Sequence, residues 1–149
     1  MTPSQKAFLD MIATSEGTIK LGDNGYNVLV GGGLFEGYKD HPRKLVWIPR
    51  LSLNSTAAGR YQLLARYFDI YKSQLKLPDF SPASQDAIAL QQIKECGAAP
   101  EIEAGNIPLA IAKCRHIWAS LPGAGYGQHE NALPMLLGAY AVAKAKYAA

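Results

Sequence analysis

The sequence predicts an α+β fold that is mainly helical and carries a small antiparallel sheet. Apolar residues recur at helical spacing near the N-terminus and again in the second half of the chain. Residues 26–53, in contrast, are rich in strand formers interrupted by glycine and proline. With 149 residues, 48% of them hydrophobic and 18% charged, the chain is long and apolar enough for one domain spanning residues 1–149.

The first helix is expected to begin close to the N-terminus. Thr2 can cap it, and Pro3 suits its first turn. Phe8, Met11 and Ile12 then follow at three- and four-residue spacing, so these side chains define the face that turns toward the core.

Glu16 continues this apolar face, because it lies four residues after Ile12, and Gly17 can end the helix directly after it. A carboxyl at the edge of a core loses water, which disfavours its charged form and raises its pKa. A carboxyl that keeps its proton near neutral pH can act as a general acid. Periodicity taken alone favours the alternative, a solvated glutamate at a frayed helix end.

The sheet is expected in the segment that follows. Residues 26–30 and 45–48 are strand-forming runs, ended by the glycines of residues 31–33 and by Pro49 respectively. We interpret residues 26–53 as a small antiparallel sheet or hairpin.

A change of period at Ser55 indicates that a helix begins there, capped by Ser55 or Thr56. The later helices are marked by proline or asparagine at their starts and glycine near their ends. They are expected from residue 81 to just before Gly97, at about 101–104, from Asn106 to 121, and from about 130 to 147.

Composition excludes several classes of function. The net charge of +3 is spread without a basic cluster, so we expect no nucleic-acid partner. No apolar run reaches the length of a membrane span, and residues 1–6 lack an apolar signal core, so we expect neither stable membrane insertion nor a signal peptide.

No metal or cofactor is expected either. Cys96 and Cys114 form neither a metal motif nor a disulfide framework, and we interpret them as reduced, buried thiols on helices. His41 and His129 have no second ligand at a metal-binding spacing, so they are interpreted as surface or turn residues.

Several motifs, in order along the chain, resemble the lambda-type phage endolysins. They are Phe8-Leu9-Asp10-Met11-Ile12 with Ser15-Glu16-Gly17-Thr18, Gly25-Tyr26 with Val30-Gly31-Gly32, residues 40–46, Ser55-Thr56 with residues 58–64, residues 79–82 and 84–87, and residues 117–128. The resemblance runs from about residue 8 to residue 128. It departs in the loop of residues 19–24 and over the last helix.

This resemblance implies a lysozyme-like fold, in which a helical lobe and a small sheet lobe flank a saccharide groove. It implies a lytic transglycosylase that cleaves peptidoglycan between N-acetylmuramic acid and N-acetylglucosamine and causes host cell lysis. No water is added, and a 1,6-anhydro muramic end is left. Glu16 matches the family's catalytic glutamate.

Hydrolysis of a glycoside normally requires two carboxylates, and here only Glu16 can be placed with conviction. Asp23, Glu36, Asp40 and Glu130 are the other acids in loops or at rims, and no spacing directs them to the site. A single acid fits a scheme in which Glu16 protonates the leaving oxygen and later accepts the proton of the sugar's 6-hydroxyl. The substrate's own N-acetyl carbonyl would stabilise the anomeric centre.

The residues expected to bind substrate are Ser55, Thr56, Arg60, Tyr61, Gln62, Tyr126 and Gln128. Most have a structural alternative, which is helix capping for the two hydroxyl residues, an ion pair for the arginine and core packing for Tyr61. Tyr126 and Gln128 lie in a glycine-rich loop without core periodicity, which favours contact with ligand. Trp47 fits either a sugar platform or the core of the sheet.

Two alternatives remain open. One is a hydrolytic N-acetylmuramidase on the same fold, and the other is an inactive glycan-binding relative. The resemblance also implies peptidoglycan glycan strands as the partners, and we expect a monomer because that is the default for a small enzyme that acts on a polymer in a groove. The protein would accumulate in the host cytoplasm and act on the wall in the periplasm after release through a holin.

Overall fold

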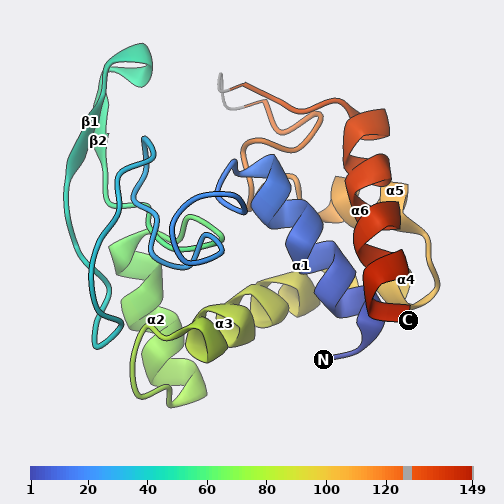
Figure 1. The fold of residues 1–149 in the computed structure, drawn as a ribbon, viewed down its shortest axis with the longest axis horizontal. Coiled ribbons are helices and arrows are strands. Elements are labelled where there is room, and N and C mark those ends of the chain that lie inside the picture. Colours follow the sequence, from blue (N-terminus) through green and yellow to red (C-terminus); the bar gives the residue numbers. More distant parts are fainter. Residues whose placement is uncertain (126–128, 149) are drawn as a thin grey trace. The chain divides into compact units, whose positions relative to one another are not determined.

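The computed structural model describes residues 1–125 and 129–148. The chain divides into two compact units, one made of residues 1–16 with 89–149 and the other of residues 17–88. The α3 helix (Pro82–Glu95) contributes residues to both. Helices dominate and the strands are few, so the predicted α+β class with a small antiparallel sheet is confirmed (Figure 1).

The first unit is built around α1 (Pro3–Ser15), which packs against α4 (Ala99–Glu103) and α6 (Leu133–Ala148). The same unit contains α5 (Ile107–Cys114), which packs against α4 and α6. Figure 1 shows α1 and α6, in blue and red, side by side. The helix that carries Glu16 therefore has packed neighbours within its own unit.

The start of α1 follows from local signals. The Thr2 hydroxyl accepts the Gln5 N–H at 3.1 Å, and the Gln5 side chain accepts the Thr2 N–H at 2.9 Å, with Pro3 in the first turn. This reciprocal capping satisfies two of the donors that a helix start leaves open. The predicted cap is confirmed.

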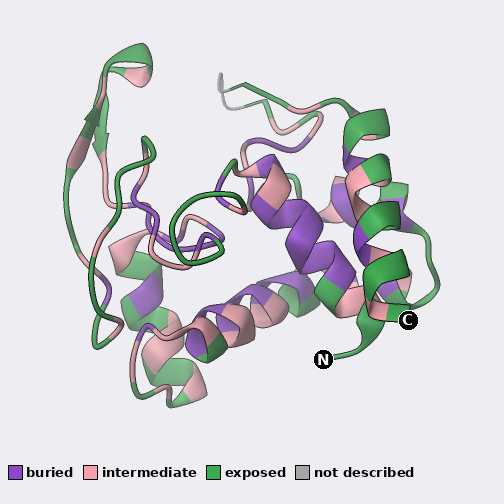
Figure 2. Ribbon diagram, in the orientation of Figure 1, coloured by how far each residue is buried: buried purple, intermediate pink, exposed green. Residues whose placement is uncertain are grey.

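More of α1 is buried than the single apolar face that the sequence predicted. Every residue from Ala7 to Ala13 is buried, so the middle of the helix is covered around its whole circumference (Figure 2). Asp10 is tolerated there because the Tyr147 hydroxyl of α6 donates to its carboxylate at 2.7 Å. A helix buried on all sides is a stiff support for the residue at its end.

The second unit contains the sheet. Strands β1 (Val46–Ile48) and β2 (Leu53–Ser55) pair antiparallel, with the 3-10 turn η1 (Pro49–Leu51) between them. The predicted run of residues 26–30 forms only isolated bridges, Val28 to Leu34 and Leu29 to Ala58. The glycines that follow, at φ of +88° and +98°, turn the chain before a ladder can extend.

The core of this unit lies between its loops, α2 (Ala65–Leu75) and the first turns of α3. Its buried members are Leu29, Ala58, Leu63, Phe68, Phe80 and Ile88. Four of these six residues lie in loops, and two of them, Ala58 and Leu63, belong to the loop of residues 56–64. That loop is therefore held by packing.

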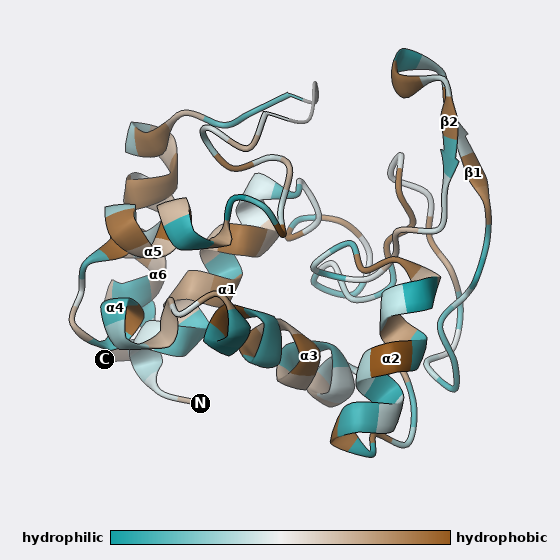
Figure 3. Cartoon of the chain, turned by 180° about the vertical axis from the view of Figure 1, so that it is seen from behind, coloured by the Kyte–Doolittle hydropathy of each residue, from teal (hydrophilic) through white to brown (hydrophobic). Residues whose placement is uncertain are grey.

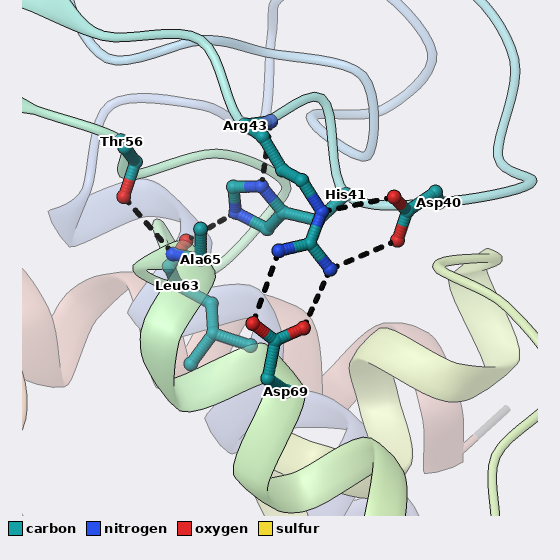
Figure 4. A network of polar contacts seen from close by, with 7 residues as sticks. All are labelled: Asp40, His41, Arg43, Thr56, Leu63, Ala65 and Asp69. Atoms are coloured by element: carbon teal, nitrogen blue, oxygen red, sulfur yellow. Dashed lines mark hydrogen bonds and ion pairs between the residues drawn. The ribbon is translucent and has the colours of Figure 1, made fainter.

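The structure corrects the helix predicted from Ser55. Ser55 ends β2, and α2 begins only at Ala65. Between them Ala58 and Leu63 pair as a bridge, with N–O distances of 3.1 and 2.9 Å. Gly59 and Gln62 have φ of +84° and +55°, outside the helical range. The prediction that Ser55 or Thr56 is the N-cap residue is therefore wrong, because Leu64 occupies that position. The Thr56 hydroxyl nevertheless accepts the N–H of Ala65, the first residue of α2, at 3.0 Å (Figure 4).

The later helices were predicted more closely. The structure confirms α3, α4 and α6 within a few residues. However, α5 ends at Cys114, and turns held by Trp118 N–H to Cys114 O and Leu121 N–H to Trp118 O continue the chain. Cys114 is buried as expected, whereas Cys96 is only partly buried, and both thiols are free.

His41 was predicted to be a surface or turn residue, and the surface position is wrong, because the residue is only 2% exposed. Its Nδ1 accepts the Arg43 N–H at 3.0 Å, so the proton sits on Nε2, which donates to Leu63 O at 2.8 Å (Figure 4). The rings of Phe68 and Phe80 lie beside it. Burial is the main reason that the pKa of His41 is lowered.

This burial predicts an acid-sensitive contribution to stability. Because the pKa of His41 lies below its usual 6.5 in the folded protein, the unfolded chain binds this proton more readily. The contribution of neutral His41 to the free energy of unfolding is therefore complete above a pH of about 6.5. Below that pH the free energy of unfolding declines by at most about 1.4 kcal/mol per pH unit. Urea unfolding at pH 8 and pH 5 should therefore differ less in His41→Gln than in the wild type. An unchanged difference would contradict this account.

Candidate active site

Glu16 is the C-cap residue of α1 and directly follows Ser15, the last residue of the helix. Its N–H donates to Ile12 O at 2.8 Å, and Gly17, at φ of +77°, then turns the chain out of the helix. The side chain is partly buried. The carboxyl therefore begins from the last turn of a fixed helix, as the sequence predicted.

Burial raises the pKa of Glu16 from 4.5 to about 7, and a hydrogen bond from the Ser120 side chain opposes part of that rise. At neutral pH the protonated and ionised forms are then similarly populated. A group in this state can give a proton in one step and take one in the next. The two causes act in opposite directions, and the loss of water is the larger.

The polar surroundings of Glu16 within its unit come from residues remote in sequence. The Ser15 and Ser120 hydroxyls lie 2.7 Å apart, although 105 residues separate them. Asn131 Nδ2 donates to Ser15 O at 2.8 Å and to Ser15 Oγ at 3.1 Å. Both serines are buried, at 7% and 8% exposure, so these hydrogen bonds are shielded from water.

Three of the other acidic candidates have structural partners. Asp23 accepts a hydrogen bond from the Tyr38 hydroxyl at 2.6 Å. Asp40 pairs with Arg43 at 2.9 Å, and Glu130 accepts the N–H groups of Gly123 and Gly125 at 2.9 and 3.0 Å. The contacts of Asp40 and Glu130 lower the pKa of both carboxyls. Asp40 and Glu130 therefore stay ionised at neutral pH, unlike Glu16.

Arg60 and Tyr61 lie in a buried polar cluster, at 4% and 5% exposure. The Arg60 guanidinium donates to the Tyr61 hydroxyl at 3.0 Å and to Asn24 O at 3.0 Å, and Tyr61 donates to Asp86 at 2.6 Å. Tyr26 also donates to Asp86, at 2.9 Å. The burial of Tyr61 agrees with the core position weighed as its alternative, whereas these contacts of Arg60 are hydrogen bonds and not the ion pair weighed for it. Substrate binding by Arg60 and Tyr61 stays a prediction.

The remaining candidates are placed as follows. The Gln62 amide donates to Val28 O at 3.2 Å and to Gly59 O at 2.9 Å, so it closes the loop of residues 56–64. The Ser55 hydroxyl accepts the Ala57 N–H at 3.1 Å. Tyr126 and Gln128 lie outside the described residues.

Trp47 is 55% exposed on β1, which removes the sheet-core alternative for this residue. Leu45 and Leu53 beside it are also exposed, and Figure 3 shows hydrophobic colouring on both strands. An exposed indole on a hairpin offers a flat apolar face for a sugar ring.

Two residues of the site were missed by the sequence analysis. Ser120 was quoted only as part of a motif, and Asn131 was not singled out at all. The signal that places them beside Ser15 is tertiary, because both come from the loop segments between α5 and α6. Helical periodicity carries no information about such a contact.

Because its pKa is raised, ionised Glu16 is expected to destabilise the folded protein at pH values above 4.5, the ordinary pKa of this group. The folded state binds this proton more tightly than the unfolded chain, so destabilisation is absent below pH of about 4.5 and complete above about 7. The shift from 4.5 to about 7 corresponds to roughly 3 kcal/mol as an upper limit. Glu16→Gln should therefore be more stable than the wild type at pH 8 in urea unfolding, and the gain should vanish at pH 4. Equal stability at pH 8 would contradict the raised pKa.

In the described part of the chain, no cluster of three or more His, Cys, Asp and Glu side chains is placed to hold a metal ion. Across the same residues, no helix has the length and apolar character needed to span a membrane.

Solved structures place the fold in the lysozyme-like class. The structure of bacteriophage lambda lysozyme complexed with a chitohexasaccharide superimposes with a TM-score of 0.91 at 56% identity, covering 96% of this chain and 95% of that one. A second structure of lysozyme from bacteriophage lambda gives a TM-score of 0.80 at 53% identity, covering 99% and 94%.

Sequence comparison identifies the family. The endolysin family model matches residues 6–147. The endolysin of Escherichia phage lambda is 60% identical over 137 residues, or 89% of this chain and 86% of the relative. That of Escherichia phage P2 is 50% identical over 143 residues, or 88% and 87%. The chain belongs to the endolysin family, and the predicted resemblance is confirmed.

Proposed function

We propose that this endolysin degrades bacterial peptidoglycan as a lytic transglycosylase, with Glu16 as its single acid and base. The observation that carries the proposal is the Glu16 carboxyl, held by burial at a pKa of about 7. A carboxyl with an ordinary pKa would be ionised at neutral pH and could not protonate a leaving group efficiently.

In the proposed reaction Glu16 donates one proton and later accepts one, so it ends in its starting protonation state. Protonated Glu16 donates to the glycosidic oxygen between N-acetylmuramic acid and N-acetylglucosamine as the bond to the anomeric carbon breaks. The N-acetyl carbonyl of the substrate stabilises the positive anomeric centre. Ionised Glu16 then accepts the proton of the 6-hydroxyl as that oxygen bonds to the anomeric carbon, which restores the acid and closes the 1,6-anhydro ring.

Several features support glycan binding. The lambda lysozyme structure with a TM-score of 0.91 contains a chitohexasaccharide, so we propose that this chain takes a glycan strand too. The proposed contacts are those predicted from the sequence, namely Ser55, Thr56, Arg60, Tyr61, Gln62, Tyr126 and Gln128. To these we add the exposed face of Trp47 as a stacking surface.

The competing function is hydrolysis by a muramidase on the same fold. It requires a water and, in most glycosidases, a second carboxylate acting as base or nucleophile. Asp40 and Glu130 have carboxyl oxygens engaged by Arg43 and by backbone N–H groups respectively, which favours the single-acid scheme. The raised pKa of Glu16 also favours an enzyme over an inactive glycan-binding relative.

Reduction of the released muropeptides with borohydride separates these functions. Purified peptidoglycan is digested to completion, treated with borohydride and analysed by mass spectrometry. A lytic transglycosylase leaves anhydro ends that lack a reducing carbon and gain no hydrogen, and this is the expected result. Reducible muramic ends would establish a hydrolase, and undigested peptidoglycan would establish a binding protein.

The cellular route follows from the endolysin assignment. We propose that the protein acts as a monomer, accumulates in the host cytoplasm and reaches the periplasmic wall after a holin opens the inner membrane.

A further inference from the structure

Behind Glu16, the side chains of Asn131, Ser15 and Ser120 form a line of hydrogen bonds. Asn131 Nδ2 lies 3.1 Å from Ser15 Oγ, and Ser15 Oγ lies 2.7 Å from Ser120 Oγ. Ser120 is also the side chain whose hydrogen bond lowers the pKa of the Glu16 carboxyl, which places it next to that carboxyl. All four residues belong to the unit of residues 1–16 and 89–149.

The direction of the first bond follows from chemistry. Asn131 faces the Ser15 carbonyl oxygen at 2.8 Å, and a carbonyl can only accept, so the group facing it is the amide NH₂. The same NH₂ reaches Ser15 Oγ, which must therefore accept as well. This removes the ambiguity that amide orientation usually carries.

By distance alone, either serine could donate in the bond between Ser15 Oγ and Ser120 Oγ. The donation from Asn131 to Ser15 Oγ favours one direction. A hydroxyl has one proton, and Ser15 Oγ accepts from Asn131, so its own proton is available to Ser120 Oγ at 2.7 Å. Ser120 then accepts from Ser15 and points its single proton at Glu16. Hydrogen bonds arranged in one direction polarise each other and strengthen the last member.

We propose that Asn131 is a positioning residue, which fixes the direction of a Ser15–Ser120 hydroxyl relay so that it always donates to Glu16. Its backbone supports this role, because the Asn131 N–H donates to Ser120 O at 2.8 Å and so fastens the loop that carries Ser120. Because the hydrogen bond from Ser120 stabilises the ionised carboxylate, the relay limits how far burial raises the pKa of Glu16. Its catalytic meaning rests on the proposed role of Glu16.

The inference is tested by titrating the Glu16 carboxyl with carbon-13 NMR in the wild type and in Asn131→Ala. Without the amide donor the two hydroxyls can reverse, and the pKa of Glu16 is expected to rise by about half a unit to one unit. Asn131→Asp should raise it further, because a carboxylate can only accept and draws both hydroxyl protons away from Glu16. The alkaline limb of the activity profile should move by the same amount.

A double-mutant comparison separates the relay from a general effect on the fold. In a Ser120→Ala background the relay has no last member, so adding Asn131→Ala should leave the pKa of Glu16 unchanged. Asn106→Asp, a second asparagine of the same unit, serves as a control for the added charge. Thermal unfolding of each variant confirms that it is folded before titration.

Two results would overturn the inference. One is the same Glu16 pKa in Asn131→Ala and wild type, and the other is a shift that persists in the Ser120→Ala background. Because NMR reads the carboxyl directly, the relay is tested even if Glu16→Gln retains lytic activity. That outcome would overturn the proposed function and leave the relay standing.

Discussion

Replacing Glu16 with glutamine is expected to lower the rate of peptidoglycan cleavage by about 10²–10⁴-fold while the protein stays folded. The amide has nearly the same size as the carboxyl and can still accept the hydrogen bond from Ser120. It cannot transfer a proton to the glycosidic oxygen. The loss should therefore fall on the chemical step, and binding of glycan strands should survive.

This result is measured as clearing of purified cell walls, alongside cosedimentation of the variant with the same walls. Glu103→Gln is a suitable control, because it removes one negative charge from the same unit at a residue whose recorded partner is Thr2. We expect the control to clear walls at the wild-type rate. A Glu16→Gln protein that clears walls as fast as the control would overturn the assignment of the acid.

Replacing Gly59 with alanine is expected to destabilise the protein by about 3–5 kcal/mol. Gly59 has φ of +84°, which strains any other residue, and an added Cβ would lie 2.9 Å from Phe80 Cζ and closer still to the Gln85 side chain. Gln85 has little room to move. Its oxygen accepts the Arg60 N–H at 2.9 Å, and its NH₂ donates to Tyr26 O and Phe80 O at 3.0 and 2.9 Å.

Gly37→Ala separates backbone strain from the clash. Gly37 lies in the same unit with φ of +80°, but a Cβ there meets nothing within 4 Å. Urea unfolding should show a loss of about 1–2 kcal/mol for Gly37→Ala, due to conformation alone. A similar loss in both variants would mean that Gln85 adapts and that its hydrogen bonds do not fix the loop.

Local signals allowed much of the helical unit to be predicted. Thr2 and Pro3 mark the start of α1, and the apolar spacing leads directly to Glu16 at its end. Each signal acts within about four residues, so no knowledge of the rest of the fold is needed. The raised pKa of Glu16 was only one of two interpretations of this spacing, since periodicity alone favoured a solvated glutamate. The family resemblance was needed to choose the buried carboxyl.

Contacts between distant residues could not be predicted in this way. The stretch after Ser55 has helical periodicity, yet pairing of Ala58 with Leu63 and with Leu29 keeps it a loop. The helix starts only at Ala65, nine residues after Thr56. His41 is buried for a similar reason, since its partner Leu63 lies 22 residues away.

Whether water enters the product is the most direct test of the account. Walls are digested in water labelled with the heavy oxygen isotope, and the released muropeptides are weighed by mass spectrometry. If Glu16 alone moves one proton out and back, the products carry no heavy oxygen at their muramic ends and are one water lighter than hydrolysis products. Incorporation of one heavy oxygen at each new end would contradict the single-acid mechanism and show that a water attacks the anomeric carbon.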